Sequence, residues 1–403
     1  MHILLIHQAF AAINEPGGTR HHEMARYLAS QGHRITIIAS PVSYLTGLAN
    51  DDPKKRGHII QDGKITILRT YTYSALHRSF VHRVFSFLSF MISSFLAGLR
   101  VHDVDLVWGT SPPIFQGLTA WALARLKRVP FLFEVRDLWP AFAIGVGVLS
   151  NPELIRASLW LERFLYLHAD LVVVNSPGFI EHVQSRGAKR VELVPNGADP
   201  RMFDPDDDGE DFQRDHNLAG NFVAIYAGAH GMSNDLGMLL RAAEILQTNP
   251  NIIVILLGDG KEKPALQQMA SDINLTNVRF LPSVSKVGMS QVLAAADACI
   301  AILKPIPLYK TVFPNKVFDY MAAGRPVVLA IDGVIREVVE QAEAGIFVPP
   351  GNATELSEAI KKLADDPGLA RNFGANGRRC VEGNYDRAAL TGRFAAIIEE
   401  IVR

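Results

Sequence analysis

Residues 311–328 hold an asparagine, a lysine and a carboxylate at a spacing suited to binding a nucleotide. Asn315 and Lys316 follow a proline at the start of an amphipathic helical pattern, and Asp319 lies about one turn further along. A helix that begins at Asn315 directs its free N–H groups and the positive end of its dipole toward whatever precedes it, and Lys316 adds a full charge. We therefore predict a phosphate group at this helix start and ribose hydroxyls at Asp319.

The same segment resembles the nucleotide-sugar site of the family 4 glycosyltransferases. Their motif, a glutamate, seven residues and a second glutamate, precedes Ala-Met-Ala-x-Gly-x-Pro-Val. Asp319 stands at the second glutamate and Thr311 at the first, where the charge is missing. In the family the first glutamate lies by the donor sugar, so Lys310 and Lys316 are expected to position the donor here. The alternative is an ordinary helix–strand unit with solvated lysines.

Two glycines follow the first predicted strand and precede a helical pattern. Gly17 and Gly18 would let backbone N–H groups approach an anion closely at a helix start, as in a loose phosphate loop. A plain turn between strand and helix is the alternative. The family resemblance implies that this loop faces the substrate cleft, so we count both glycines as site residues.

Polar residues also gather at the ends of two strands in the first half of the chain, where open α/β sheets bind ligands. Residues 108–114 carry Ser111, and residues 133–140 carry Arg136, Asp137 and Trp139. The second motif resembles a subgroup that builds bacterial O-antigen and exopolysaccharide repeats, including the WbuB-like, lipid-linked N-acetylfucosamine transferases. Many family members have a His-Asp pair here, so the family's catalytic histidine is absent.

Arg136 is then expected to bind phosphate or orient a hydroxyl, unless it forms a structural ion pair with a neighbouring carboxylate. Together with Asp137, Lys316 and Thr311 it makes up the predicted catalytic set, while Ser111 and Trp139 are expected near the acceptor. His21 and His22 are expected on a solvated first helical turn.

The second half of the chain offers further donor contacts. Gly228 and Gly231 would expose backbone N–H groups to a diphosphate. Relatives carry an arginine and a lysine in or after this turn, which are missing here, so Lys316, Lys310 and Arg325 are the expected charge partners. By resemblance, the base pocket lies near Arg279 and Leu281. No set of His, Cys, Asp and Glu has metal-ligand spacing, so we expect no metal and no cofactor besides the nucleotide sugar.

Residues 79–100 predict a helix that lies in the surface of a membrane. Residues 84–99 contain no charge, and this run is shorter than the roughly 20 residues that span a bilayer. Serines fall on one helical stripe, apolar side chains cover the other side, and basic residues flank both ends. The alternatives are a core helix with its serines facing out and a transmembrane anchor. Much of the membrane contact is expected from Phe87, Leu88, Met91 and Phe95.

The whole chain alternates apolar strands with helices, which predicts α/β domains with parallel sheets covered on both faces. Its 403 residues suit two domains, divided by the acidic, proline-containing stretch after residue 200. The arrangement resembles the GT-B fold, two Rossmann-like domains facing a cleft. We predict a first domain over 1–200, a second over 201–386, and a last helix, 387–403, that crosses back. Strands are predicted at 2–7, 35–39, 65–69, 105–108, 130–135, 170–174, 191–194, 222–227, 252–257, 278–281, 298–302, 326–330 and 345–348.

Composition limits the classes of partner and the cellular compartment that we expect. The net charge of −1 gives no case for nucleic acid as a partner, and two cysteines suit a reducing compartment. The first residues form a strand pattern, so no signal peptide is expected. The resemblance implies a retaining glycosyltransferase that moves a sugar from a UDP-sugar to a polyprenyl-diphosphate-linked saccharide, and an N-acetylated amino sugar is one candidate for the sugar. The reaction would serve O-antigen, capsule or exopolysaccharide synthesis in the cytoplasm, at the inner face of the membrane. A UDP-sugar 2-epimerase and a non-catalytic, membrane-associated sugar-binding protein remain as alternatives.

Overall fold

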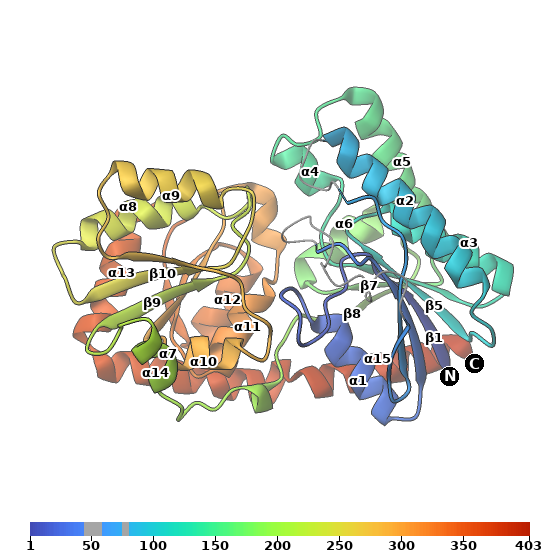
Figure 1. Cartoon of the computed structure of the whole chain (residues 1–403). Coiled ribbons are helices and arrows are strands. Elements are labelled where there is room, and N and C mark those ends of the chain that lie inside the picture. The colour runs from blue at the N-terminus through green and yellow to red at the C-terminus, as the bar shows by residue number, and fades with distance from the viewer. Residues whose placement is uncertain (44–58, 75–79) are drawn as a thin grey trace. The chain divides into compact units, whose positions relative to one another are not determined.

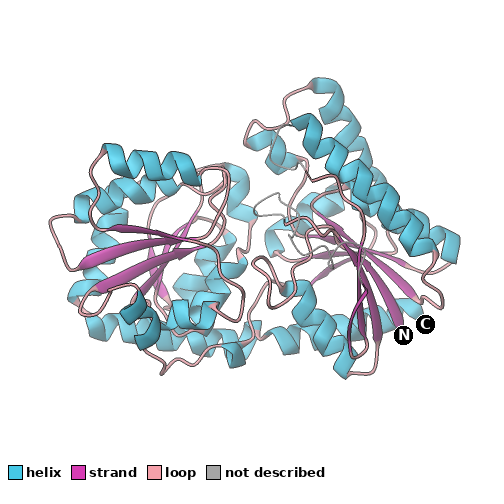
Figure 2. Cartoon of the chain, in the orientation of Figure 1, coloured by secondary structure: helices cyan, strands magenta, loops and turns pink. Residues whose placement is uncertain are grey.

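The computed structural model describes residues 1–43, 59–74 and 80–403, which form two compact units. Unit 1 comprises residues 1–12, 17–195 and 388–403, and unit 2 comprises residues 13–16 and 196–387. Each unit is a sheet of mainly parallel strands with helices on both faces (Figure 1, Figure 2). The predicted class, α/β with two doubly wound domains, is confirmed. The main division falls between Pro195 and Asn196, where the sequence predicted it at residue 200.

The sheet of unit 1 has eight strands in the order β3-β4-β2-β1-β5-β6-β7-β8. The strand β3 pairs antiparallel with β4, and the other neighbours are parallel. The sequence did not predict β3, a short edge strand joined to β4 by a turn at Gly63. The strands are β1 (His2–Ile6), β2 (Arg34–Ala39), β3 (Ile59–Asp62), β4 (Ile65–Arg69), β5 (Leu106–Ser111), β6 (Phe131–Val135), β7 (Leu171–Val174) and β8 (Val191–Leu193).

Helices cover both faces of this sheet. On one face, α1 and the last helix, α15, pack Met24, Leu28 and Phe394 against Ile3 and Trp108. The last helix therefore returns to the first domain, as predicted. On the other face, α2, α3 and α5 lie side by side with α3 in the middle (Figure 1). The helices of unit 1 are α1 (Arg20–Ser30), α2 (Phe80–Leu99), α3 (Phe115–Lys127), α4 (Ala141–Gly145), α5 (Pro152–His168), α6 (Ile180–Ser185) and α15 (Arg387–Val402).

The helix predicted over 79–100 is present as α2, and the alternative of a core helix with its serines facing out is wrong. A stripe of mostly small residues, Ser86, Phe90, Ser94 and Gly98, is buried. The Ser94 hydroxyl donates to the Met91 carbonyl of its own helix, whereas the Ser86 hydroxyl has no hydrogen-bond partner among the described residues, and Gly98 lets Leu123 of α3 approach closely. The small stripe therefore serves close helix packing, and apolar side chains face out. Ser79 and the basic residues His77 and Arg78 lie outside the described residues.

The sheet of unit 2 has six parallel strands in the order β11-β10-β9-β12-β13-β14. The strands are β9 (Phe222–Ala227), β10 (Ile252–Leu257), β11 (Val278–Leu281), β12 (Ala298–Ile302), β13 (Val327–Ala330) and β14 (Gly345–Phe347). The helices are α7 (Glu210–Asp215), α8 (Leu236–Leu246), α9 (Lys263–Asp272), α10 (Met289–Ala294), α11 (Asn315–Ala322), α12 (Val334–Gln341), α13 (Ala353–Asp365) and α14 (Pro367–Cys380).

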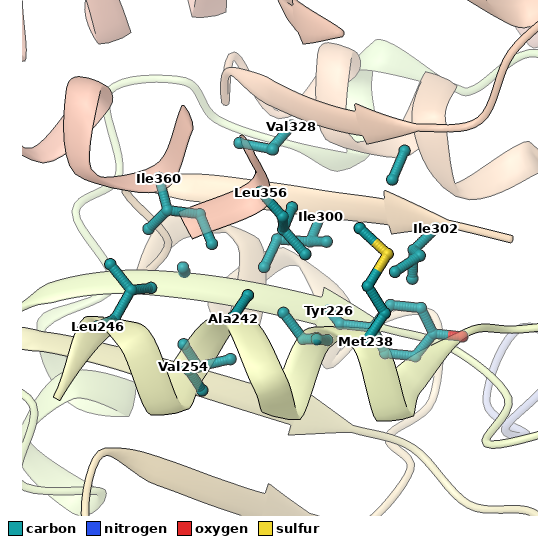
Figure 3. Packing of buried hydrophobic residues seen from close by; sticks show 14 of the residues in the cluster. Tyr226, Met238, Ala242, Leu246, Val254, Ile300, Ile302, Val328, Leu356 and Ile360 are labelled. Atoms are coloured by element: carbon teal, nitrogen blue, oxygen red, sulfur yellow. The ribbon is translucent and has the colours of Figure 1, made fainter. Parts of the chain in front are cut away.

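The core of unit 2 forms where α8 and α13 cover the central strands. Figure 3 shows Met238, Ala242 and Leu246 of α8 pointing toward the sheet, where Ile300 and Val328 come from neighbouring strands. Each of these side chains is almost completely buried. Burying a large aliphatic side chain stabilises the fold by about 1.5–3 kcal/mol, so this layer holds the loops at the strand ends in place.

Candidate functional site

The carboxyl end of the sheet in unit 1 is built around Glu134, a charged residue inside the apolar strand β6. One carboxylate oxygen accepts a hydrogen bond from Arg20 Nε at 3.1 Å. The other accepts from His21 Nε2 at 2.6 Å and from Trp108 Nε1 at 3.1 Å. Burial raises the pKa of Glu134, but His21 and Arg20 outweigh it and hold that pKa well below its ordinary value. Glu134 is therefore ionised, and hydrogen bonds from the protein occupy most of its acceptor positions.

The prediction that His21 and His22 are solvated is wrong. Their residues are 1% and 6% exposed, because the first turn of α1 packs against the end of the sheet. Burial lowers the pKa of His21 to about 4 although Glu134 opposes this, so the ring is neutral at pH 7. His7, which follows β1, lies over His21 with ring centroids 4.3 Å apart and bonds to Thr110 Oγ1 through Nδ1. A histidine pair thus lies at this end of the sheet, supplied by β1 and α1 instead of β6.

Arg136 follows β6 and lies close enough to His7 and His21 to lower the pKa of each. In the part of the chain that the structure describes, no ion pair of Arg136 is found, and its Nη2 donates to the Pro112 carbonyl at 3.2 Å. The alternative of a structural ion pair with a neighbouring carboxylate is therefore wrong, since Arg20 and His21 occupy Glu134. The charge of Arg136 still helps to lower the pKa of Glu134 and opposes the rise in the pKa of Asp137. Asp137 is exposed at the surface beside it.

The two predicted acceptor residues, Ser111 and Trp139, lie in different surroundings. Ser111 is buried at the end of β5, and its carbonyl accepts from the Arg136 backbone N–H. The half-buried Trp139 packs on Phe115, with ring centroids 5.9 Å apart, and Phe115 packs equally closely on Phe87 of α2. Phe87 is half-buried, and part of its ring packs against the protein.

The other three predicted membrane residues, Leu88, Met91 and Phe95, are half-buried. The side chains that α2 exposes most are Ile92 at 59%, Phe85 at 58% and Leu96 at 54%. Residues 82–99 are long and apolar enough to cross a membrane by length and composition alone.

The predicted glycine loop lies directly before α1. Gly17 has a φ of 142°, and a Cβ there would come within 2.9 Å of the Ala11 side chain. A Cβ at Gly18 would meet nothing within 4 Å. Gly17 is thus required by the backbone, whereas Gly18 leaves open space at the start of the helix.

In unit 2, Gly228 and Lys316 are brought together at the carboxyl end of the sheet. A Cβ at Gly228 would lie 2.5 Å from Lys316 Nζ, and the φ of 153° at this position favours glycine. Lys316 Nζ also lies over the Tyr226 ring, 3.8 Å from its centre. The side chain of Lys316 is only partly exposed, and burial lowers its pKa to about 7. No carboxylate within the described ranges pairs with it, so a bound anion would supply its missing partner.

The loops after β9 and β10 pack tightly against each other beside this lysine. A Cβ at Gly258 would overlap the Gly228 carbonyl, and one at Gly260 would overlap the backbone of His230. The His230 ring is completely buried between these loops, and burial lowers its pKa to about 4. These contacts fix the loop that carries Gly228 and Gly231.

The predicted base pocket is only partly supported by the geometry. The Leu281 carbonyl accepts from Lys263 Nζ at 3.0 Å and from the Gly258 N–H at 3.1 Å, so it belongs to the loop scaffold. Arg279 lies exposed on the edge strand β11. Lys263 was not singled out by the sequence, although its place four residues after Asp259 suits the ion pair that they form.

Asp319, the predicted ribose ligand, forms an ion pair that the sequence did not indicate. Its Oδ1 lies 2.5 Å from Lys286 Nζ, and both side chains are largely buried. Asn315 Nδ2 donates to the other carboxylate oxygen at 3.3 Å, and Asn315 Oδ1 accepts from Arg387 at 2.7 Å. Lys286 comes from the loop after β11, more than thirty residues earlier, so only the fold could reveal this pair.

The remaining predicted donor residues contact groups other than Lys316. Thr311 donates its hydroxyl hydrogen bond to the Leu308 carbonyl at 2.7 Å. Lys310 is exposed and pairs with Asp332 at 2.8 Å. Arg325 precedes β13 and donates to the Asp207 carbonyl, which places it at the amino end of the sheet. The expectation that Arg325 is a charge partner of the donor is therefore wrong.

Comparisons with known proteins cover both units. Residues 17–197 match the family described as glycosyl transferase 4-like domain, and residues 208–380 match the family described as glycosyl transferases group 1. The chain is 24% identical over 381 residues to the putative colanic acid biosynthesis glycosyl transferase WcaI of Escherichia coli K12. The alignment covers 87% of this chain and 93% of that protein.

Solved structures resemble the whole chain. Sucrose-phosphate synthase from Thermosynechococcus elongatus superposes with a TM-score of 0.79 at 20% identity, covering 99% of this chain and 98% of that one. Anabaena Alr3699/HepE, solved in complex with UDP and glucose, superposes with a TM-score of 0.74 at 18% identity, covering 99% and 100%. At these identities the likeness establishes the fold.

The Glu134 network predicts a large loss of stability when its carboxylate is removed. Glu134→Ala leaves Arg20 buried without its carboxylate and should lower the free energy of unfolding by about 3–5 kcal/mol in urea titrations. Because the pKa of Glu134 is lowered in the folded state, its stabilisation is complete above about pH 4.3 and is lost only as the pH falls well below that. The control Glu192→Ala, which removes a partly exposed pair, should cost under about 1 kcal/mol. Equal losses in both variants would contradict this account.

The buried pair of Asp319 and Lys286 predicts coupled stability effects. Asp319→Ala should cost about 3 kcal/mol, since Lys286 is left buried without its partner. Adding Lys286→Met should restore at least half of that loss, which thermal or urea unfolding of the single and double variants would measure. Additive losses in the double variant would show that the two side chains do not depend on each other.

Proposed function

The chain is a glycosyltransferase with the GT-B fold, and from this premise we propose that it transfers a sugar from a UDP-sugar to a polyprenyl-diphosphate-linked saccharide. The product would be a repeat unit of a bacterial O-antigen, capsule or exopolysaccharide. The similarity to WcaI, named for colanic acid biosynthesis, supports a polysaccharide product. The observation that carries the proposal is the unpaired Lys316 beside Gly228 at the carboxyl end of the sheet in unit 2.

Three features of unit 2 support a nucleoside diphosphate as the donor. The eight-residue helix α11 begins at Asn315 and directs its first N–H groups toward the end of the sheet. Lys316 supplies a cation there, and the loop at Gly228 supplies backbone without side chains. HepE, which shares the fold, was solved with UDP, and this favours UDP as the nucleotide. Asp319 would accept hydrogen bonds from the ribose hydroxyls, and its ion pair with Lys286 would loosen to allow this.

The proposed reaction breaks the bond between the anomeric carbon of the sugar and the diphosphate oxygen. The acceptor hydroxyl oxygen bonds to the same face of that carbon, so the configuration is retained, and its proton passes to the departing diphosphate. Negative charge develops on the leaving group, and Lys316 with the first N–H groups of α11 would stabilise it. We infer retention and independence of a metal ion from the family resemblance.

The acceptor would bind at the carboxyl end of the sheet in unit 1. Arg136 forms no ion pair among the described residues, so it suits the diphosphate of a lipid-linked acceptor. Asp137, Ser111 and Trp139 lie on the same loops. An acceptor anchored in a bilayer requires the enzyme to work at the membrane surface, and the apolar outer stripe of α2 supports a peripheral place at the inner face of the cytoplasmic membrane.

A donor screen tests the reaction. Purified enzyme is incubated with bacterial membranes and a panel of UDP-, GDP- and ADP-sugars, and nucleotide release is measured. We expect one UDP-sugar to give release that requires the membrane acceptor and yields a labelled lipid-linked product. Release from GDP- or ADP-sugars alone would overturn the choice of donor, and an isomerised sugar formed without acceptor would overturn the transfer.

Lys316 gives a prediction for activity and its pH dependence. Lys316→Ala should lower kcat by about a hundredfold, equivalent to about 3 kcal/mol, while the control Lys310→Ala should stay within about threefold. Because the pKa of Lys316 is lowered to about 7, the amine is charged below that pH and loses its charge above it. The donor KM of the wild type should therefore rise above pH 7, by up to about tenfold per pH unit.

Lys316→Arg keeps its charge at every pH used and should remove this rise in KM, whatever its effect on kcat. If the donor KM of the wild type does not change between pH 6 and pH 9, the amine does not bind the diphosphate.

A further inference from the structure

The helix layer of unit 1 exposes apolar side chains on two separate helices. Along α2, Phe85, Ile92 and Leu96 form one stripe at helical spacing, opposite the small residues that pack on α3. Along α5, Trp160 is 65% exposed and Leu167 is 37% exposed. Within the described ranges, nine of the fifteen large hydrophobic residues that are exposed lie on α2, α3 and α5. Such clustering on one face exceeds the scattered exposure of ordinary surfaces and indicates an interaction site.

The helix α3 lies between these two helices and is sunk below them. Most of its residues are buried or half-buried, and only its last turn and the residue after it reach the surface with Arg125, Leu126 and Arg128. The helices α2 and α5 therefore form two apolar ridges on the same face of the sheet (Figure 1). We call Phe85, Ile92, Leu96, Leu126, Trp160 and Leu167 the two-ridge surface.

The charges around the two-ridge surface are almost all positive. On α5, Arg156 and Arg163 alternate with Trp160 and Leu167 along one helical stripe. The last turn of α3 adds its own arginines. Across α2, α3 and α5 the only exposed acidic residue is Glu153, which pairs with Arg156, since Glu162 is buried against His182 and Arg186.

We propose that the two-ridge surface is where the enzyme docks on an anionic lipid bilayer, with α2 and α5 both immersed in the headgroup region. This rests on the proposed function, because it specifies how the enzyme meets its membrane-bound acceptor. Apolar ridges would enter the acyl boundary, Trp160 would lie at the interface, and the arginines would attract anionic headgroups. Contact through both ridges fixes the orientation of unit 1 on the membrane, which a single helix could not do.

A bilayer fits this surface better than a protein partner does. Protein interfaces pair apolar centres with hydrogen-bonding groups of both charge signs, whereas this surface joins apolar ridges to one sign of charge. Arginines whose stems run beside apolar side chains and whose heads reach outward suit lipid headgroups. A second copy of the chain would bring the same positive charges face to face.

The test measures binding of the full-length protein to vesicles of phosphatidylglycerol and phosphatidylcholine, and of phosphatidylcholine alone, by co-sedimentation. The double variant Ile92→Ser, Leu96→Ser removes one ridge and Trp160→Ser removes the apolar centre of the other. Each should lower the partition coefficient by about tenfold, and the triple variant should fall to background. Arg163→Glu should weaken binding to the anionic vesicles about tenfold and leave binding to neutral vesicles unchanged.

Val287→Ser is the matched control, because Val287 is 60% exposed but lies in unit 2. It should bind vesicles like the wild type. All altered side chains except Arg163 are apolar and exposed, so thermal unfolding temperatures should stay close to that of the wild type, which shows that lost binding is not lost folding. UDP release with a soluble acceptor analogue should also persist in every variant.

Three results would overturn the proposal. The first is that the wild type fails to bind anionic vesicles, and the second is that Trp160→Ser binds them as the wild type does. The third is that the wild type is a dimer in solution and Trp160→Ser dissociates it, which would make a second copy of the chain the occupant of this surface. Vesicle binding without UDP release from any donor would instead refute the proposed reaction and leave the docking surface intact.

Discussion

The burial of charged side chains is the constraint on which the carboxyl ends of both sheets depend. A parallel sheet gathers the carboxyl ends of its strands at one end, where loops crowd and water is scarce, so each ionised group there needs a partner. Glu134 is matched by Arg20 and His21, Asp319 by Lys286, and Asp259 by Lys263. Each partner comes from a different element or a later turn, so these pairs also hold the loops in register.

Among the described residues, Arg136 and Lys316 form no ion pair, and each lies at the carboxyl end of a sheet. Arg136 is released from Glu134 because other groups saturate that carboxylate, and Lys316 lies against a tyrosine ring and a glycine with no carboxylate beside it in the described structure. A cation kept without a counter-ion is costly unless a ligand supplies the charge. The network around Glu134 thus has a consequence for function, because it leaves Arg136 available to an anion.

The helix α2 shows that a correct periodicity leaves open which face points into the protein. Its periodicity indicates two faces, and a serine-rich face beside an apolar one ordinarily means that the serines meet water. Here the small side chains allow close approach to α3, the Ser94 hydroxyl bonds to the Met91 carbonyl, and the apolar face is left outside. Periodicity states that two faces differ, while the choice of the inward face depends on the shape of the neighbour.

By itself, the sequence determined the fold class, the alternation of elements and nearly every strand to within a residue or two, because continuous apolar runs between glycine- and proline-containing loops have few other solutions. It also determined the helix start at Asn315, since that depends on local geometry. The tertiary structure decided the burial of His21, the pairing of Asp319 with Lys286, the removal of Arg325 from the site and the exposed ridge of α5. Those features join residues far apart in the chain, and no local pattern specifies which distant side chain arrives within hydrogen-bond distance.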